Sequence, residues 1–168
     1  KSTGIYGGTI DWGDGVLTPN SYANRTHIYT NSGQYLIAVT GTIDGFCFGD
    51  TLILTGNNEM VLDVLQWGSD FKFGTAETTE GKFIGCTNLQ QISALDTPNF
   101  TNTTSLARMF EGCNNFVGGP AMNNWDIRSV TNMAEMFYSA YVFNSNIGGW
   151  DVSNVTDMRL MFENAYIF

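Results

Sequence analysis

Few side chains in the sequence could carry catalytic chemistry. His27 is the single histidine, so it is the one candidate base for a serine or cysteine nucleophile. It lies far along the chain from Cys86 and Cys113, and no motif of a nucleotide-binding loop, a hydrolase nucleophile or a zinc peptidase occurs. We therefore expect His27 to be a structural residue that bonds across strands, in a protein that is not an enzyme.

Two carboxylates in matching positions, Asp126 and Asp151, could in principle form a catalytic pair. Neighbouring strands lie about 4.8 Å apart, and glycosidases hold their two carboxylates about 5 to 10 Å apart. Asn99 occupies the same position one segment earlier, which is typical of a side chain that bonds the backbone at a turn. We favour that interpretation, with a calcium or solvent role and catalysis as alternatives. Asp11 and Asp14 likewise indicate turn chemistry, with structural Ca²⁺ as the weaker alternative.

The three cysteines, Cys47, Cys86 and Cys113, cannot all pair, and none has the spacing of a zinc site. Cys86 and Cys113 occur in similar contexts, and Ala140 and Ala165 follow at the equivalent positions. The position therefore requires a small buried side chain, and the cysteines meet that requirement without a redox role. We expect neither a metal site nor a cofactor.

Aromatic side chains provide the candidate binding surface. Tyr141 and Tyr166 occupy equivalent positions next to the small residues, and Tyr138 lies one helical turn away. Tyrosine offers a flat apolar face and a hydroxyl, so these residues could bind sugars or protein. The alternative is that the rings pack over helix ends. Trp125 and Trp150 also share a position, and their regular spacing indicates core packing.

Glycosylation is the one modification that the sequence suggests. Four Asn-x-Ser/Thr sites, at Asn24, Asn99, Asn102 and Asn154, could carry N-linked glycans if the source is eukaryotic. Asn102 and Asn154 precede expected helix starts, where asparagine also has an ordinary capping use.

Composition and charge exclude several classes of protein. The chain has 168 residues, of which 43% are hydrophobic and 14% charged, as expected for one or two folded domains. The formal net charge of −9 argues against binding to nucleic acid. No apolar run of about 18 residues could span a membrane, and no signal peptide is recognisable. The first residue is Lys1, so we expect a processed or partial product.

An internal repeat organises the second half of the chain. Residues 124–137 match residues 149–162 at an offset of 25, and weaker copies lie 27 residues apart back to about residue 83. Such self-similarity predicts a solenoid of stacked rungs.

Each rung has a pattern that favours a short helix. The side chains of residues 131–132 and 156–157 could cap a helix start, and apolar residues follow at 133, 136, 137 and 140. This i, i+3, i+4, i+7 spacing predicts one apolar stripe over two helical turns. Residues 143–147 alternate in polarity as a strand does, and 150–152 read as a second short strand. The rung is therefore predicted to be strand, turn, short strand and helix.

The first part of the chain has a different pattern. Expected strands at 9–12, 27–29, 34–43 and 51–54 alternate with glycine-rich turns, among them Gly13-Asp14-Gly15 between antiparallel strands. This pattern predicts a small antiparallel β-sandwich. The predicted fold class is thus α+β. Its three parts are a sandwich at 1–55, a linker and solenoid cap at 56–82, and repeats at 83–168. Within the second part, residues 60–68 are expected to cover the end of the solenoid.

Two families are recognisable in these segments. The sequence motif at 150–162 and its copy at 125–137 resemble the repeat of BspA-like leucine-rich-repeat surface proteins. Residues 65–68, 83–89 and 95–100 are similar to the first rungs of such arrays. Residues 10–15 and 27–35 resemble the PKD-type β-sandwich module.

The resemblance implies an exported protein at a cell surface or virion surface that acts in adhesion. Its expected partner is a protein or glycan on another surface, or further copies or rungs of the same protein. The alternative function is a structural subunit of a fibre, appendage or virion that assembles through solenoid ends. The apolar stripe of Met158, Met161 and Phe162 has no following rung in the sequence, so we expect the array to continue or another chain to cover it.

Overall fold

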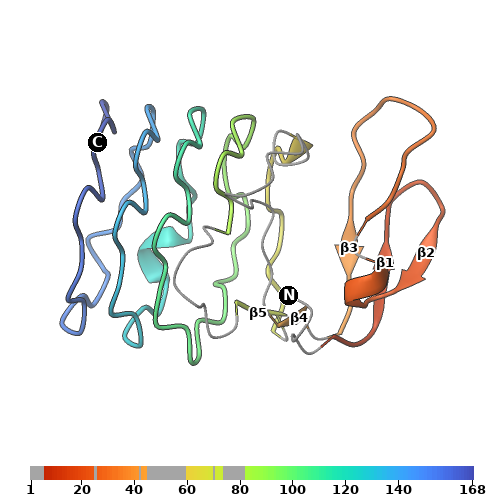
Figure 1. The fold of residues 1–168 in the computed structure, drawn as a ribbon, viewed down its shortest axis with the longest axis horizontal. Helices are drawn as coiled ribbons and strands as arrows, with labels where there is room; N and C mark the ends of the chain where they lie inside the picture. Colours follow the sequence, from red (N-terminus) through yellow and green to blue (C-terminus); the bar gives the residue numbers. More distant parts are fainter. Residues whose placement is uncertain (1–5, 25, 42, 45–59, 70, 74–81) are drawn as a thin grey trace.

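The computed structural model describes residues 6–24, 26–41, 43–44, 60–69, 71–73 and 82–168. The N-terminal sheet lies at one end, and a series of stacked rungs extends from it to the C-terminal end (Figure 1). Among the described residues there is no helix with the length and apolarity needed to cross a membrane.

The N-terminal sheet has three antiparallel strands. Strand β1 (Thr9–Asp11) pairs with β2 (Leu17–Pro19) through the predicted glycine-rich turn, with Ile10 opposite Thr18. Strand β3 (Ala38–Val39) pairs with the other side of β1, so the strand order is β2-β1-β3. A single 3-10 turn, η1 (Tyr22–Asn24), follows β2.

The predicted β-sandwich is wrong for the described residues. Residues 27–29 and 34–37 form no strand. Side chains connect the first of these segments to the hairpin, because His27 bonds Asp14 and the Tyr29 hydroxyl bonds the Trp12 carbonyl. Strand β4 (Ile43–Asp44) pairs in parallel with β5 (Phe71–Lys72), outside the three-stranded sheet. The strand expected at 51–54 lies outside the described residues.

The second half of the chain consists of rungs whose backbones bond to one another. Parallel bridges join Ser105 to Asn132 and Asn132 to Asp157, and the 3-10 turn η3 (Met122–Asn124) lies on one rung. Equivalent side chains stack along the array. One column of rings contains Phe83, Phe110, Phe137 and Phe162, with successive centroids 5.4, 5.6 and 5.5 Å apart and interplanar angles of 6 to 8°.

The predicted α+β class, with a helix in every rung, is wrong. No α-helix occurs among the described residues. Where the sequence pattern predicts a helix, Glu135 and Ser139 instead have φ angles of 59° and 57°, which interrupt a right-handed helix. The residues expected to cap the helix, Asn132 and Asp157, still accept a backbone hydrogen bond from the residue two positions later.

Consecutive β-turns explain why the pattern looked helical. Met136 donates its N–H to the carbonyl of Met133, and Ala140 donates to the carbonyl of Phe137. Each is a four-residue turn whose third residue has the positive φ that a type II turn requires. The first and last residues of both turns are fully buried. Two such turns in succession therefore bury positions i, i+3, i+4 and i+7, the same positions as an amphipathic helix.

Residues 60–68 lie against the first rung. Gln90 and Ala94 donate their N–H groups to the carbonyls of Leu62 and Val64. The Asp96 carboxylate accepts the N–H of Trp67 at 3.0 Å, and the Trp67 ring is buried in the aromatic core.

Candidate functional site

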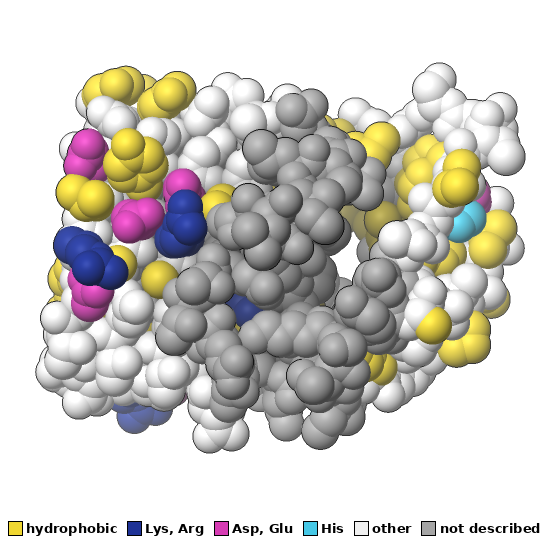
Figure 2. Space-filling view, viewed as in Figure 1, with side chains coloured by type: hydrophobic (Ala, Val, Ile, Leu, Met, Phe, Trp, Pro, Cys, Tyr) yellow, Lys and Arg dark blue, Asp and Glu magenta, His cyan; other side chains and the backbone are white. Residues whose placement is uncertain are grey.

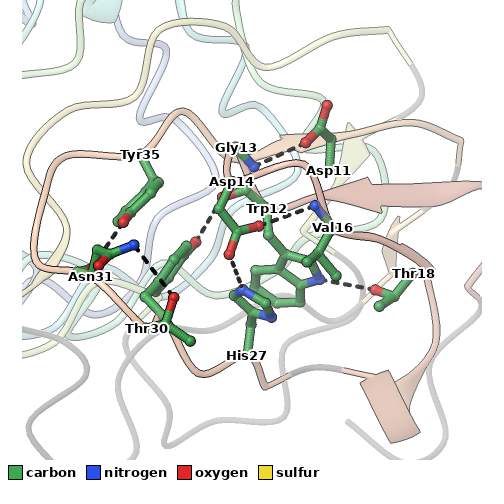
Figure 3. Close-up of polar contacts among 11 residues, drawn as sticks. Asp11, Trp12, Gly13, Asp14, Val16, Thr18, His27, Thr30, Asn31 and Tyr35 are labelled. Carbon is green, nitrogen blue, oxygen red and sulfur yellow. Dashed lines mark hydrogen bonds and ion pairs between the residues drawn. The ribbon is translucent and has the colours of Figure 1, made fainter.

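His27 lies in a cluster of aromatic and acidic side chains beside the β1–β2 hairpin (Figure 3). Its Nε2 atom is 2.7 Å from Oδ2 of Asp14. The ring of Trp12 stacks on the imidazole, with centroids 4.9 Å apart and planes 17° apart. Asp14 Oδ1 also accepts the N–H of Val16. The pKa of Asp14 is below its ordinary value, mainly because of the hydrogen bond to His27 and to a smaller extent because of the bond from Val16.

Two tyrosines complete this cluster. The Tyr29 ring meets the imidazole edge-on, and Tyr35 stacks on Tyr29 with centroids 4.1 Å apart. The Tyr29 hydroxyl donates to the Trp12 carbonyl at 2.9 Å, and desolvation raises the pKa of that hydroxyl. The His27–Asp14 contact and the bond from the Tyr29 hydroxyl to the Trp12 carbonyl fasten the segment that contains His27 and Tyr29 to the hairpin.

The aspartates in the predicted column hold turns. Oδ1 of Asp151 accepts the N–H of Ser153 at 3.0 Å, and Oδ1 of Asn99 accepts that of Thr101 at 2.9 Å. Asp126 binds the Arg128 side chain through both carboxylate oxygens, which lowers the pKa of Asp126 to about 2. A general acid needs a raised pKa, so this arrangement suits turn stabilisation rather than glycoside hydrolysis.

The buried cysteines lie in the core of the array. Cys86 and Cys113 are free and buried, and the Cys113 thiol donates to the Phe83 carbonyl at 3.0 Å. Burial raises the pKa of the Cys113 thiol well above its ordinary value, so it lacks thiolate character. Cys47 lies outside the described residues. No group of three or more histidine, cysteine, aspartate or glutamate side chains in the described part of the chain could hold a metal ion.

Two of the three candidate binding tyrosines, Tyr141 and Tyr166, lie on one corner of the array, which is a further β-turn in each rung. We call the two central residues of this turn the corner pair. In four successive rungs the corner pairs are Thr87-Asn88, Asn114-Asn115, Tyr141-Val142 and Tyr166-Ile167. Tyr141 and Tyr166 are 39% and 74% exposed, and their rings stack with centroids 5.5 Å apart. Tyr138 is half-buried and is not part of a corner pair.

Two features of this end of the array were not predicted from the sequence. Val142 and Ile167 extend the apolar corner, and the change from Asn115 to Val142 at the same position could have indicated this. An ion-pair network also links two rungs, because Arg108 binds Glu111 and lies 3.3 Å from Glu135. Figure 2 shows exposed hydrophobic side chains at the C-terminal end, close to acidic and basic ones.

The four glycosylation sites differ in their accessibility. The side-chain amide nitrogens of Asn24 and Asn154 donate to backbone carbonyls, and the Asn99 carbonyl oxygen accepts in its turn. Asn102 is exposed, has a φ of 65°, and makes no side-chain hydrogen bond with the described residues. No helix follows Asn102 or Asn154, so neither has the predicted capping role.

Comparison with known proteins identifies one family. A family model described as "Mycoplasma protein of unknown function, DUF285" matches residues 77–168, which include the rungs. No curated protein and no solved structure matches the chain significantly.

Proposed function

The chain belongs to the DUF285 family, and we propose that it is a non-enzymatic extracellular module that binds a partner at a cell surface. The contact surface is the pair of apolar corner turns at residues 141–142 and 166–167. The surface location follows from the resemblance to BspA-like and PKD-type proteins.

The observation that carries this proposal is the change in the corner pairs along the array. The turn at 113–116 closes with a hydrogen bond from Phe116 to Cys113, and the turn at 140–143 closes in the same way. Asparagine therefore satisfies the fold at this corner, and the turn itself does not require an aromatic residue. Exposed tyrosine next to an apolar residue has the composition of a recognition surface.

Ring orientation favours a protein partner over a glycan. The planes of Tyr141 and Tyr166 are 20° apart and the rings are stacked, so the facing sides cover each other and the outer side of Tyr166 is the one open ring face of this pair. Sugars bind aromatic residues through exposed ring faces, whereas ring edges and hydroxyls suit backbone carbonyls and apolar side chains. We therefore take a protein as the partner.

Binding to cultured animal cells tests this function. We expect saturable binding of the labelled protein that is lost when the cells are treated with trypsin, and that falls at least about tenfold in affinity in the Tyr141→Ser/Tyr166→Ser variant. Leu95→Ser is a matched control, because Leu95 is 84% exposed on an earlier rung.

The opposite results would count against the proposal. Equal loss of binding in the Leu95 control would point to general adhesiveness. Binding that resists trypsin but disappears after glycosidase treatment would assign the surface to a glycan instead.

A further inference from the structure

Cys86 and Cys113 lie in the buried core, at equivalent positions of adjacent rungs. Each follows a glycine with almost the same backbone conformation, since φ is 68° at Gly85 and 69° at Gly112. At both cysteines the N–H donates to the carbonyl three residues earlier, and the carbonyl accepts the N–H three residues later. Because the two backbones match, the two Cα–Cβ bonds are parallel and both side chains point the same way into the core.

The two rungs are close together at this position. The Gly85 N–H donates to the Glu111 carbonyl at 2.7 Å, and an added Cβ on Gly112 would lie 3.6 Å from the Gly85 Cα. Backbones joined by such bonds lie about 4.8 Å apart, and disulfides span Cα atoms about 4.4 to 6.8 Å apart. The backbone spacing between Cys86 and Cys113 therefore suits a disulfide bond.

The Cys113 thiol already points toward the rung that contains Cys86. It donates to the Phe83 carbonyl at 3.0 Å, and the same carbonyl accepts the Cys86 N–H at 3.0 Å. Burial raises the pKa of the Cys113 thiol, and the neighbouring Cys86 thiol raises it further. A turn of the Cys113 sulfur toward Cys86 would leave the Phe83 carbonyl bonded to the Cys86 N–H, so no buried acceptor would lose its last partner.

The fold itself does not require cysteine at this position. Ala140 occupies it in the next rung and is fully buried, and Ala165 follows one rung later. Alanine therefore fills the position, whereas the two cysteines stand on neighbouring rungs. We propose that Cys86 and Cys113 form a disulfide bond that ties these two rungs together. Neither the bond nor its test depends on the function proposed above.

The oxidant for this bond is a small disulfide such as oxidised glutathione. The thiolate of one cysteine attacks a sulfur of the small disulfide, which forms a mixed disulfide and releases one small thiol. The thiolate of the other cysteine then attacks the protein sulfur of the mixed disulfide and releases the second small thiol. The two cysteine sulfurs lose two electrons and two protons in total, and the two released thiols carry them. Because both cysteines are fully buried, the exchange takes place while the array folds or opens.

Equilibration with reduced and oxidised glutathione tests the proposal, in the full chain with Cys47→Ser so that the third cysteine cannot compete. Trypsin cleaves after Arg108, between the two cysteines, so only the disulfide joins the peptides 83–108 and 109–128. We expect mass spectrometry to find these joined peptides from both the reduced and the oxidised starting protein. The equilibrium constant for oxidation should be about tenfold or more larger in native buffer than in concentrated urea, because the fold favours a bond that stabilises it.

The matched control keeps two thiols in the same column but places them two rungs apart. In the Cys47→Ser/Cys113→Ala/Ala140→Cys variant, the thiols at positions 86 and 140 lie about 10 Å apart, which is twice the rung spacing and more than a disulfide spans. Its oxidation constant should be smaller in native buffer than in urea. A constant for the Cys86–Cys113 pair that is equal or smaller in native buffer overturns the proposal. Equal oxidation of the two proteins in native buffer also overturns it, because pairing would then come from the unfolded chain.

Discussion

Asp14 and His27 connect two segments that share no backbone ladder. The Asp14→Asn variant should lower the stability of the N-terminal sheet near neutral pH, because it removes the charged partner of His27. Since the pKa of Asp14 is lowered in the folded state, its contribution is present above the pKa of an unfolded aspartate and is lost as the pH falls through the folded value. Urea unfolding followed by the NMR signal of the Trp12 indole N–H, which distinguishes Trp12 from the three other tryptophans, should therefore show a difference between wild type and variant that disappears in acid.

The control for Asp14 is Asp11→Asn, since the Asp11 carboxylate accepts the N–H of Gly13 in the same turn but does not bind His27. If both variants show the same pH dependence, the turn rather than the His27 contact is responsible. The sequence predicted that His27 bonds across strands, whereas His27 lies in no strand and bonds Asp14 in the hairpin turn. The sequence could not identify this partner, because the two residues are 13 positions apart.

Arg128 controls the ionisation of Asp126. The paired guanidinium holds the pKa of Asp126 at about 2, so Arg128→Gln should raise that pKa toward the ordinary aspartate value. An NMR titration of the Asp126 side-chain carbon measures the shift. Asp14 is the internal reference, since its lowered pKa depends first on His27 and not on Arg128. A midpoint of Asp126 that is unchanged in the variant would show that the turn alone lowers it.

At the scale of the element, one substitution distinguishes a turn from a helix, because its expected effect on stability has the opposite sign in the two structures. Ser139 has a φ of 57°, and Gly85 and Gly112 occupy the equivalent position in earlier rungs. Ser139→Gly should stabilise the fold by about 0.5 to 1 kcal/mol, because glycine tolerates a left-handed backbone. In a helix the same change would cost about 0.5 kcal/mol. Urea unfolding at equilibrium gives the sign.

The reverse substitution is the matched control. Gly112 has a φ of 69°, and an added Cβ would lie 3.6 Å from the nearest atom, the Gly85 Cα, which is an ordinary contact. Gly112→Ala should therefore cost about 1 kcal/mol from backbone strain alone. A stabilising effect of alanine there would contradict the turn assignment.

The buried positions of the rung could be predicted from the sequence, but its backbone could not. Met133, Met136, Phe137 and Ala140 are all fully buried, as their spacing indicates. The spacing of apolar residues indicates which side chains face inward, and a helix and a pair of turns bury the same four positions. The glycines at 85 and 112 were the signal that could have distinguished them, because a column made of glycine, serine and asparagine indicates positive φ.

At the scale of the whole molecule, the repeat offset is also the offset of the bonds that hold the array together. Thr156 donates through its hydroxyl to Thr131, 25 residues earlier, and Thr131 donates to Thr104, 27 residues earlier. The sequence could not predict the direction of these junctions, since donors and acceptors belong to the backbone, which every residue supplies. That direction appears only once the turns are known.

Because neighbouring rungs supply each other's contacts, a whole rung should be removable. Deletion of residues 126–150 joins Trp125 to Asp151 and brings Thr156 to the place of Thr131. The N–H groups of Leu106 and Phe110 would then donate to the carbonyls of Asp157 and Met161. We expect a folded chain with a lower unfolding midpoint, since one interface is lost. Deletion of residues 126–137 is the control, because it shifts polar residues into buried positions and should abolish cooperative unfolding. Tryptophan fluorescence in urea and gel filtration distinguish the two, and equal disruption by both deletions would show that distant contacts hold the array.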